Sequence, residues 1–159
     1  MLVQIAPVEA MRGVCEATPA ETADSPDPAW TDLFLAEGFD PVDGASRAKA
    51  LSRADNSVFA SVRENGKTVA AGAGAFSHGW SSVHGMRTDQ AFRGKGLAGR
   101  VLASVAAAAT ERGIERAFLQ VENINASALS LYRRAGFETA WSYDYWTQPE
   151  PQPVNAETP

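Results

Sequence analysis

Alternating apolar and polar residues in the middle of the chain predict three consecutive β-strands, over residues 57–64, 67–76 and 80–89. Asn65-Gly66 separates the first two runs, and this dipeptide favours the tight turn of an antiparallel hairpin. The three runs are therefore expected to form an antiparallel meander.

The third of these strands carries several side chains that bear on function. Because side chains alternate along a strand, Val83 is expected on one face and His84, Met86 and Thr88 on the other. These three side chains should then share one face of the sheet.

Helical periodicity follows the meander. Apolar residues spaced three and four apart predict helices over 97–113 and 125–136, each ending on a glycine that suits a helix C-terminus. Strands are expected over 115–122 and 137–146, after the first and the second of these helices. Strands and helices alternate in this half of the chain, which is typical of crossover connections within a sheet.

The N-terminal third has weaker patterning. One strand is expected within residues 2–18, placed around 13–18, and the stretch over 17–30 is predicted to be a loop. A first helix begins at Asp27-Pro28, a break is expected over 37–44, and a second amphipathic helix is expected over 45–54. The predicted order is strand, two helices, three antiparallel strands, helix, strand, helix and a final strand or strand pair. This order predicts an α/β fold with a mixed sheet (α+β).

Length and composition fit one domain. A chain of 159 residues can bury a single core, and we expect that domain to span residues 1–146. Residues 147–159 are rich in proline and polar side chains, so they are predicted to form a disordered tail.

Charge and residue counts narrow the function classes. A formal net charge of −5 disfavours a general nucleic-acid or anionic-membrane partner. With Cys15 as the single cysteine and only two histidines, no metal site is expected. There is no signal-peptide pattern and no long apolar run, so a cytoplasmic location is expected by elimination.

The stretch Arg93–Gly99, RGKGLAG, has the spacing of a dinucleotide-binding loop. The preceding strand is polar, four residues separate it from Gly94, and only about 60 residues remain for further βα units, so an NAD-binding oxidoreductase is disfavoured. Glycines before a helix still favour an anion site, because successive backbone N–H groups can converge on a phosphate. Nearby Arg87 and Arg100 add positive charge.

Two motifs read together resemble a known family. Arg93, Gly96 and Ala98 fit the pattern Arg/Gln-x-x-Gly-x-Gly/Ala. The later helix fits N-x-x-A-x-x-L-Y-x-x-x-G-F through Asn125, Ala128, Leu131, Tyr132, Gly136 and Phe137. This pair resembles the GNAT superfamily of acetyl-CoA-dependent N-acetyltransferases over about residues 80–146, which is also similar to the second half of longer tandem members.

The resemblance implies a site for coenzyme A and the GNAT acyl-CoA N-acyltransferase fold. Backbone N–H groups of the glycine loop would hold the pyrophosphate, and the strand before the loop would pair with the pantetheine arm. The residues implied in cofactor binding are Met86, Arg87, Thr88, Arg93, Gly94, Lys95, Gly96, Leu97, Ala98, Gly99, Asn125, Ala128 and Tyr132.

The resemblance also assigns catalytic roles. Tyr132 would act near the sulfur of the leaving thiolate. Some members carry a glutamate base where this chain has Ser82, which cannot serve unaided. His84, Glu122 or bulk water would then take the proton, and the residues alone leave these alternatives open.

The expected function is transfer of an acetyl group from acetyl-CoA to a primary amine of a small molecule or peptide. A non-catalytic module that binds acyl-CoA is the alternative, favoured if Ser82 marks loss of the base. The expected partners are acetyl-CoA and the amine acceptor, with a homodimer as a possible assembly and neither nucleic acid nor membrane as a partner.

Overall fold

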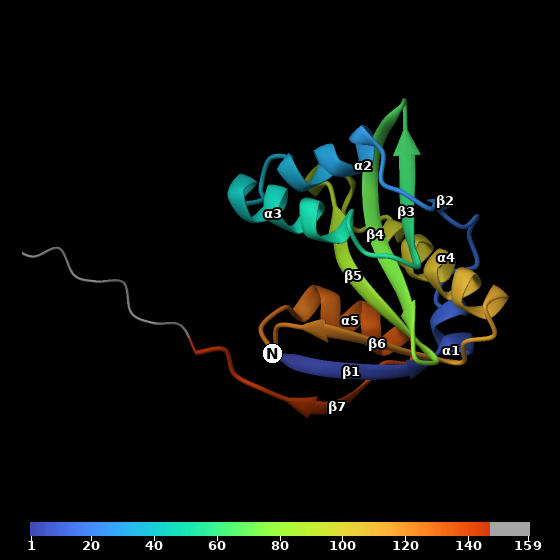
Figure 1. The fold of residues 1–159 in the computed structure, drawn as a ribbon. Coiled ribbons are helices and arrows are strands. Elements are labelled where there is room, and N and C mark those ends of the chain that lie inside the picture. The colour runs from blue at the N-terminus through green and yellow to red at the C-terminus, as the bar shows by residue number, and fades with distance from the viewer. Residues whose placement is uncertain (147–159) are drawn as a thin grey trace, which may run out of the picture.

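The computed structural model describes residues 1–146 and contains, within them, a seven-stranded mixed sheet with the order β2-β3-β4-β5-β6-β1-β7 (Figure 1). The strands are β1 (Leu2–Pro7), β2 (Glu21–Ala23), β3 (Ser57–Glu64), β4 (Lys67–Ser77), β5 (Trp80–Thr88), β6 (Arg116–Val121) and β7 (Glu138–Ser142). The helices are α1 (Val8–Arg12), α2 (Pro28–Asp32), α3 (Pro41–Leu51), α4 (Leu97–Glu111) and α5 (Ala126–Arg134), with short 3-10 turns η1 (Leu33–Leu35) and η2 (Gln90–Phe92). The predicted mixed α/β sheet is confirmed, and so is the element order from residue 57 onward.

The described residues end at Trp146, which is also the expected end of the domain. The predicted tail over 147–159 lies outside the described residues, and one domain over 1–146 stays a prediction. Within the described part, none of the helices is both long and apolar enough to cross a membrane.

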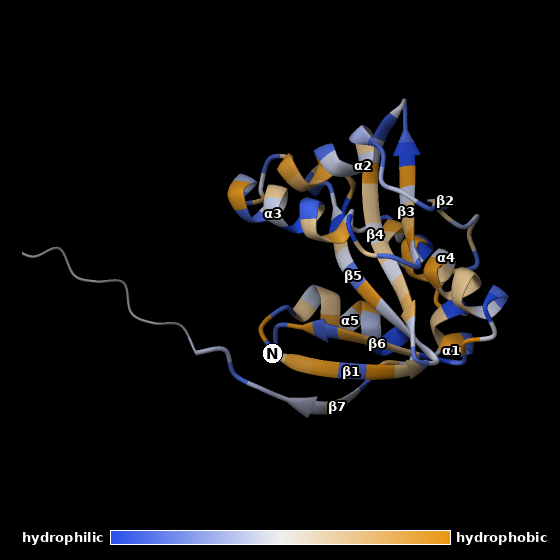
Figure 2. Cartoon of the chain, in the orientation of Figure 1, coloured by the Kyte–Doolittle hydropathy of each residue, from blue (hydrophilic) through white to orange (hydrophobic). Residues whose placement is uncertain are grey.

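Helices pack on both faces of the sheet. On one face α4 packs so closely on β4 that a Cβ added at Gly74 would lie only 2.5 Å from Val105 Cγ1. On the other face Trp30 and Phe34 of α2 and η1 pack with Phe59 of β3. Hydrophobic residues mark the inner strands in Figure 2, where β1 is coloured mainly hydrophobic and β7 is pale. The sheet therefore has two packed cores near its middle and an exposed strand, β7, at one edge.

One strand does lie within residues 2–18, but its predicted position around 13–18 is wrong. The first strand is β1, which lies between β6 and β7 and pairs antiparallel with both. Residues after α1 run instead beside α4, where Arg100 Nε donates to the Thr18 carbonyl at 2.6 Å. Strand β2 falls in a stretch that the sequence predicts as loop, and it pairs with β3.

Two helix starts use the same signal, Asp followed by Pro. The Asp27 carboxylate accepts a hydrogen bond from the Trp30 N–H at 2.8 Å and confirms the predicted start of α2. Asp40 accepts from the Asp43 N–H at 2.8 Å, so α3 begins at Pro41 and not at residue 45.

We expect Gly44→Ala to destabilise the protein by about 2 kcal/mol, because the added methyl group overpacks the contact between α3 and η1. A Cβ at Gly44 would lie 2.0 Å from the Phe34 carbonyl oxygen. Helix propensity alone predicts the opposite sign, a gain of about 1 kcal/mol. Thermal unfolding of the variant shows whether overpacking or helix propensity has the larger effect on stability.

Gly13→Ala is the matched control for this substitution. At Gly13 the nearest atom to an added Cβ is 3.6 Å away, and the backbone is near the right-handed helical region. Its melting temperature should stay the same or rise slightly. Equal changes in the melting temperature of Gly44→Ala and Gly13→Ala would contradict the packing argument.

Candidate functional site

The candidate site lies where β5 and β6 separate. The two strands pair in parallel from Trp80↔Arg116 to Val83↔Leu119, and the pairing then ends. In Figure 1 they start side by side and open into a V. The edge of β5 over 84–88 that faces β6 has no strand partner among the described residues. We call this gap the β5–β6 opening.

Helices α4 and α5 both begin at the open end of this V. Helix α4 follows β5 through η2, and α5 follows β6 after a short turn. Since β5 and β6 are parallel, their carboxyl ends lie on the same side, and so do the two helix N-termini. The fold therefore brings the glycine loop and the α5 motif to the two sides of one opening.

The glycine loop is open to an external ligand. Gly94 and Gly96 both have φ of +75°, and a Cβ at either position would meet no atom within 4 Å. At the start of the loop the Arg93 N–H donates to the Gln90 carbonyl at 3.4 Å, and at its end the Gly99 N–H donates to the Gly96 carbonyl at 3.0 Å. Among the described residues, none of the backbone hydrogen bonds is donated by an N–H group from Gly94 to Ala98. The N–H groups from Gly94 to Ala98 thus remain available at the positive end of α4, which fits a pyrophosphate.

Charged side chains near the loop divide into two groups. Arg93 and Lys95 are exposed beside it, with Lys95 Nζ 4.6 Å from the centre of the Phe92 ring. Arg100 instead bonds the Thr18 carbonyl. Leu97 buries its side chain in the core below the loop, so it offers only backbone there.

The Arg87 side chain points away from the loop, which corrects the prediction that its charge belongs there. Its guanidinium lies 4.4 Å from the Phe39 ring centre and 5.3 Å from that of Phe34. It also pairs with Asp43 of α3 at 3.6 Å. Burial lowers the pKa of Arg87, but an arginine stays protonated. Only the Arg87 backbone remains on the β5–β6 opening.

A β-bulge on β5 corrects the prediction that His84, Met86 and Thr88 share a face. Ala73 pairs with His84 and Ala71 with Arg87, so Gly85 and Met86 together oppose a single residue of β4. His84 lies on the face of α3 and η1, whereas Met86 packs toward the α4 core. Gly85, with φ of +60°, makes the bulge possible, and a glycine inside a strand is the signal that sequence reasoning could have used.

His84 stands where the β5–β6 pairing ends. Its Nε2 lies 2.8 Å from Ser82 Oγ, and Ser82 Oγ donates to the Ala75 carbonyl at 3.2 Å. The ring keeps contact with solvent, but surrounding protein displaces part of its hydration and lowers the pKa of His84 below 6.5. A neutral imidazole at physiological pH can accept a proton.

The α5 residues lie on the other arm of the opening. Asn125 caps α5, since its Oδ1 accepts from the Ala128 N–H at 3.1 Å, and its side-chain NH2 group is left to donate. The Tyr132 ring is buried against Phe137 at 5.7 Å between centroids. Burial raises the pKa of Tyr132 to about 12. Glu122 is exposed just beyond the end of β6.

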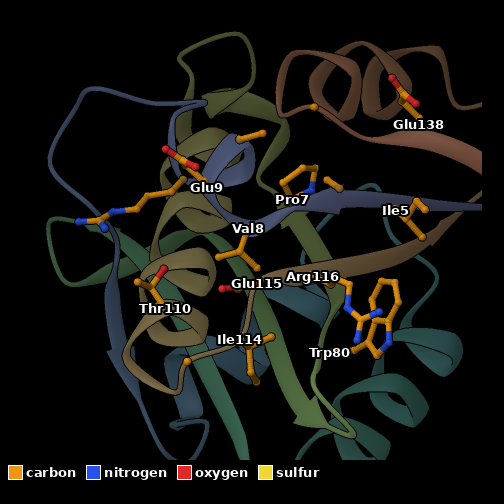
Figure 3. Close-up of a pocket in the computed structure, with 15 residues that line it drawn as sticks. Ile5, Pro7, Val8, Glu9, Trp80, Thr110, Ile114, Glu115, Arg116 and Glu138 are labelled. Carbon is orange, nitrogen blue, oxygen red and sulfur yellow. The ribbon is translucent and has the colours of Figure 1, made fainter.

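A cavity of the described part lies away from this site. It has a volume of about 1090 Å³ and lies between β1, α1, the C-terminal end of α4 and the start of β6 (Figure 3). Its lining includes Glu9, Thr110 and Arg116, and the Arg116 guanidinium stacks on Trp80 at 4.6 Å. Helix α4 has 15 residues, so this cavity is separated from the glycine loop by about 22 Å.

Within residues 1–146, no three His, Cys, Asp or Glu side chains lie close enough together to bind a metal ion.

Comparisons with known proteins agree with the geometry. The family model for the acetyltransferase (GNAT) family matches residues 20–137. Streptothricin acetyltransferase from Streptomyces lavendulae is 36% identical over 116 residues, which are 70% of this chain and 58% of that protein. Among solved structures, a GNAT-family acetyltransferase from Colwellia psychrerythraea is similar with a TM-score of 0.66 at 20% identity, covering 87% of this chain and 52% of that one.

A second solved structure is that of an aminoglycoside N-acetyltransferase in complex with CoA. It is similar with a TM-score of 0.54 at 16% identity, covering 68% of this chain and 84% of that one. The chain spans about half the length of the curated relatives that it matches. The family model covers most of the sheet, the glycine loop and α5, and the chain belongs to the acetyltransferase (GNAT) family.

Proposed function

We propose that this protein transfers an acetyl group from acetyl-CoA to a primary amine of a small molecule or peptide. The open glycine loop at the head of α4, beside the unpaired edge of β5, is the observation that carries the proposal. Family membership and a structural neighbour that binds CoA support it.

The proposed binding mode uses mainly backbone groups. The pyrophosphate would accept hydrogen bonds from N–H groups of Gly94 to Gly99, with Arg93 and Lys95 neutralising its charge. The pantetheine arm would lie along the free edge of β5 at Met86, Arg87 and Thr88. The Asn125 side-chain NH2 group and the α5 segment at Ala128 would border it on the opposite side.

The reaction that we propose is a direct displacement. The acceptor enters as an ammonium, because an alkylamine has a pKa of roughly 10, and loses one proton to His84. The amine nitrogen then attacks the acetyl carbonyl carbon; the C–N bond forms, the C–S bond breaks and the electron pair goes to sulfur. The second proton leaves the nitrogen, and the thiolate takes up one proton. A backbone N–H near Met86 would stabilise the developing charge on the carbonyl oxygen.

Tyr132 is proposed as the donor to the leaving sulfur. With a pKa of about 12 the hydroxyl stays protonated at neutral pH. A thiol has a pKa of about 8.5, so full transfer of the tyrosine proton is unfavourable. Tyr132 would therefore stabilise the thiolate by a hydrogen bond, and water would supply the proton.

Tyr132→Phe should lower kcat about tenfold, because a hydrogen bond to a charged group is lost. The CoA dissociation constant should stay close to that of the wild type, since the phenyl ring can keep the packing against Phe137. Steady-state kinetics and calorimetric titration with CoA measure the two quantities. A large loss of CoA affinity would make Tyr132 a cofactor contact or a structural residue.

Two measurements distinguish an enzyme from a non-catalytic module that binds acyl-CoA. CoA is titrated first, and thiol release from acetyl-CoA is then followed with a panel of amines that includes streptothricin, an aminoglycoside and a lysine-containing peptide. Turnover with at least one amine supports the proposal. Binding without turnover supports the module, and absence of CoA binding contradicts both.

A further inference from the structure

We infer that Ser82 is a positioning residue that fixes the tautomer of His84, so that Nδ1 is the atom that accepts the proton from the acceptor. The inference rests on the proposed function for its catalytic part. Ser82 cannot act as a base unaided, but its hydroxyl can orient the imidazole beside it.

The hydrogen bonds around Ser82 determine the direction of each proton. A serine hydroxyl has one hydrogen, and a backbone carbonyl can only accept. Ser82 Oγ gives that hydrogen to the Ala75 carbonyl at 3.2 Å, so its contact of 2.8 Å with His84 Nε2 is a hydrogen bond that the imidazole donates. Neutral His84 therefore carries its proton on Nε2 and has its lone pair on Nδ1.

Strand geometry holds this arrangement in place. Ser82 is buried, with 8% of its surface exposed, and it pairs with Ala75 across β4 and β5. His84 follows two residues later on the same face, just before the bulge at Gly85. Ser82 and His84 therefore meet on one side of β5, at the point where the strand leaves β6.

The hydrogen bond between His84 and Ser82 also stabilises the imidazolium that forms when His84 is protonated. When Nδ1 takes a proton from the acceptor ammonium, the imidazolium keeps its Nε2–H bond to Ser82 Oγ, and the hydroxyl keeps its bond to Ala75. No proton needs to move along the chain of hydrogen bonds. Ser82 then orients the base and stabilises its cation, as the third group does in other catalytic arrangements of this kind.

Nuclear magnetic resonance of ¹⁵N-histidine-labelled protein tests the tautomer without any acceptor. Above pH 8 the His84 spectrum should show a protonated Nε2 and an unprotonated Nδ1, with His78→Asn used to assign the two histidines. Ser82→Ala should lose this preference and Ser82→Thr should retain it. A protonated Nδ1 in the wild type, or an unchanged tautomer in Ser82→Ala, would overturn the inference.

Kinetics test the catalytic part with a matched control. Ser82→Ala should lower kcat about tenfold with little change in the KM for acetyl-CoA, and Ser82→Thr should restore most of the rate. Ser81 is the control, because its hydroxyl is buried on the opposite face without a partner among the described residues, and Ser81→Ala should leave kcat unchanged. Unchanged kcat in Ser82→Ala would contradict the positioning role. Turnover of no amine by the wild type, with the Nε2–H tautomer present, would instead contradict the proposed function and leave the tautomer assignment standing.

Discussion

Gly96→Asp is expected to weaken CoA binding about 100-fold, because the new carboxylate would face the pyrophosphate at close range. Gly96 is the N-cap of α4, has φ of +75° and is exposed, with open space where a side chain would project. A side chain there occupies the approach to the backbone N–H groups and brings a like charge to the ligand. Calorimetric titration with CoA measures the loss.

Gly66→Asp separates this effect from backbone strain. Gly66 lies in the turn between β3 and β4, has φ of +79°, and likewise has no atom within 4 Å of an added Cβ. Both variants carry the same new charge and the same left-handed backbone, which costs about 1–2 kcal/mol for a residue with a side chain. Gly66→Asp should bind CoA as the wild type does. Equal CoA affinity in Gly96→Asp and the wild type would contradict the assignment of the loop to the pyrophosphate.

Local patterning predicted most elements from residue 57 onward. The hairpin at Asn65-Gly66 follows from two residues that tolerate a positive φ, and both residues have it here, 51° and 79°. Asp27-Pro28 correctly predicted a helix start. Asp40-Pro41 gives the same signal, but the break predicted over 37–44 puts the expected start of α3 four residues too late.

Partners distant in sequence account for the errors at the N-terminus. Strand β1 pairs with residues more than a hundred positions away, as in Val3↔Gln120 and Val3↔Trp141. Nothing within a short window of sequence indicates that a first strand inserts between β6 and β7. Strand β2 has three exposed residues, too few to produce an alternating pattern.

For the candidate site, motif spacing predicts which residues belong to it better than it predicts how they are arranged. Motif spacing indicated the glycine loop, Asn125 and Tyr132, and the fold places them around one opening. The bulge at Gly85 changes which face each later side chain occupies, so Arg87 joins Phe39 and Asp43 on the α3 side. Strand alternation cannot anticipate such a change unless the glycine is interpreted as a bulge.

His84→Asn is expected to lower kcat about 100-fold, since a positioned general base contributes a factor of at least that size. Wild-type kcat/KM should fall as the pH drops through the His84 pKa, which partial desolvation lowers below 6.5, because the imidazole must be neutral to accept a proton. The variant should lack this acidic limb and keep the CoA affinity of the wild type. Rates measured from pH 5 to 9 test all three statements.

The second histidine provides a close control. His78 is exposed in the turn between β4 and β5, and its Nδ1 contacts Ser77 Oγ at 2.6 Å, so it too is bonded to a serine hydroxyl. His78 has φ of 50°, which asparagine tolerates, and His78→Asn should leave the rate unchanged.

Glu122→Gln tests the rival base on the other arm of the opening. A large loss in Glu122→Gln with none in His84→Asn would move the base to Glu122, and no loss in either variant would assign the proton to water.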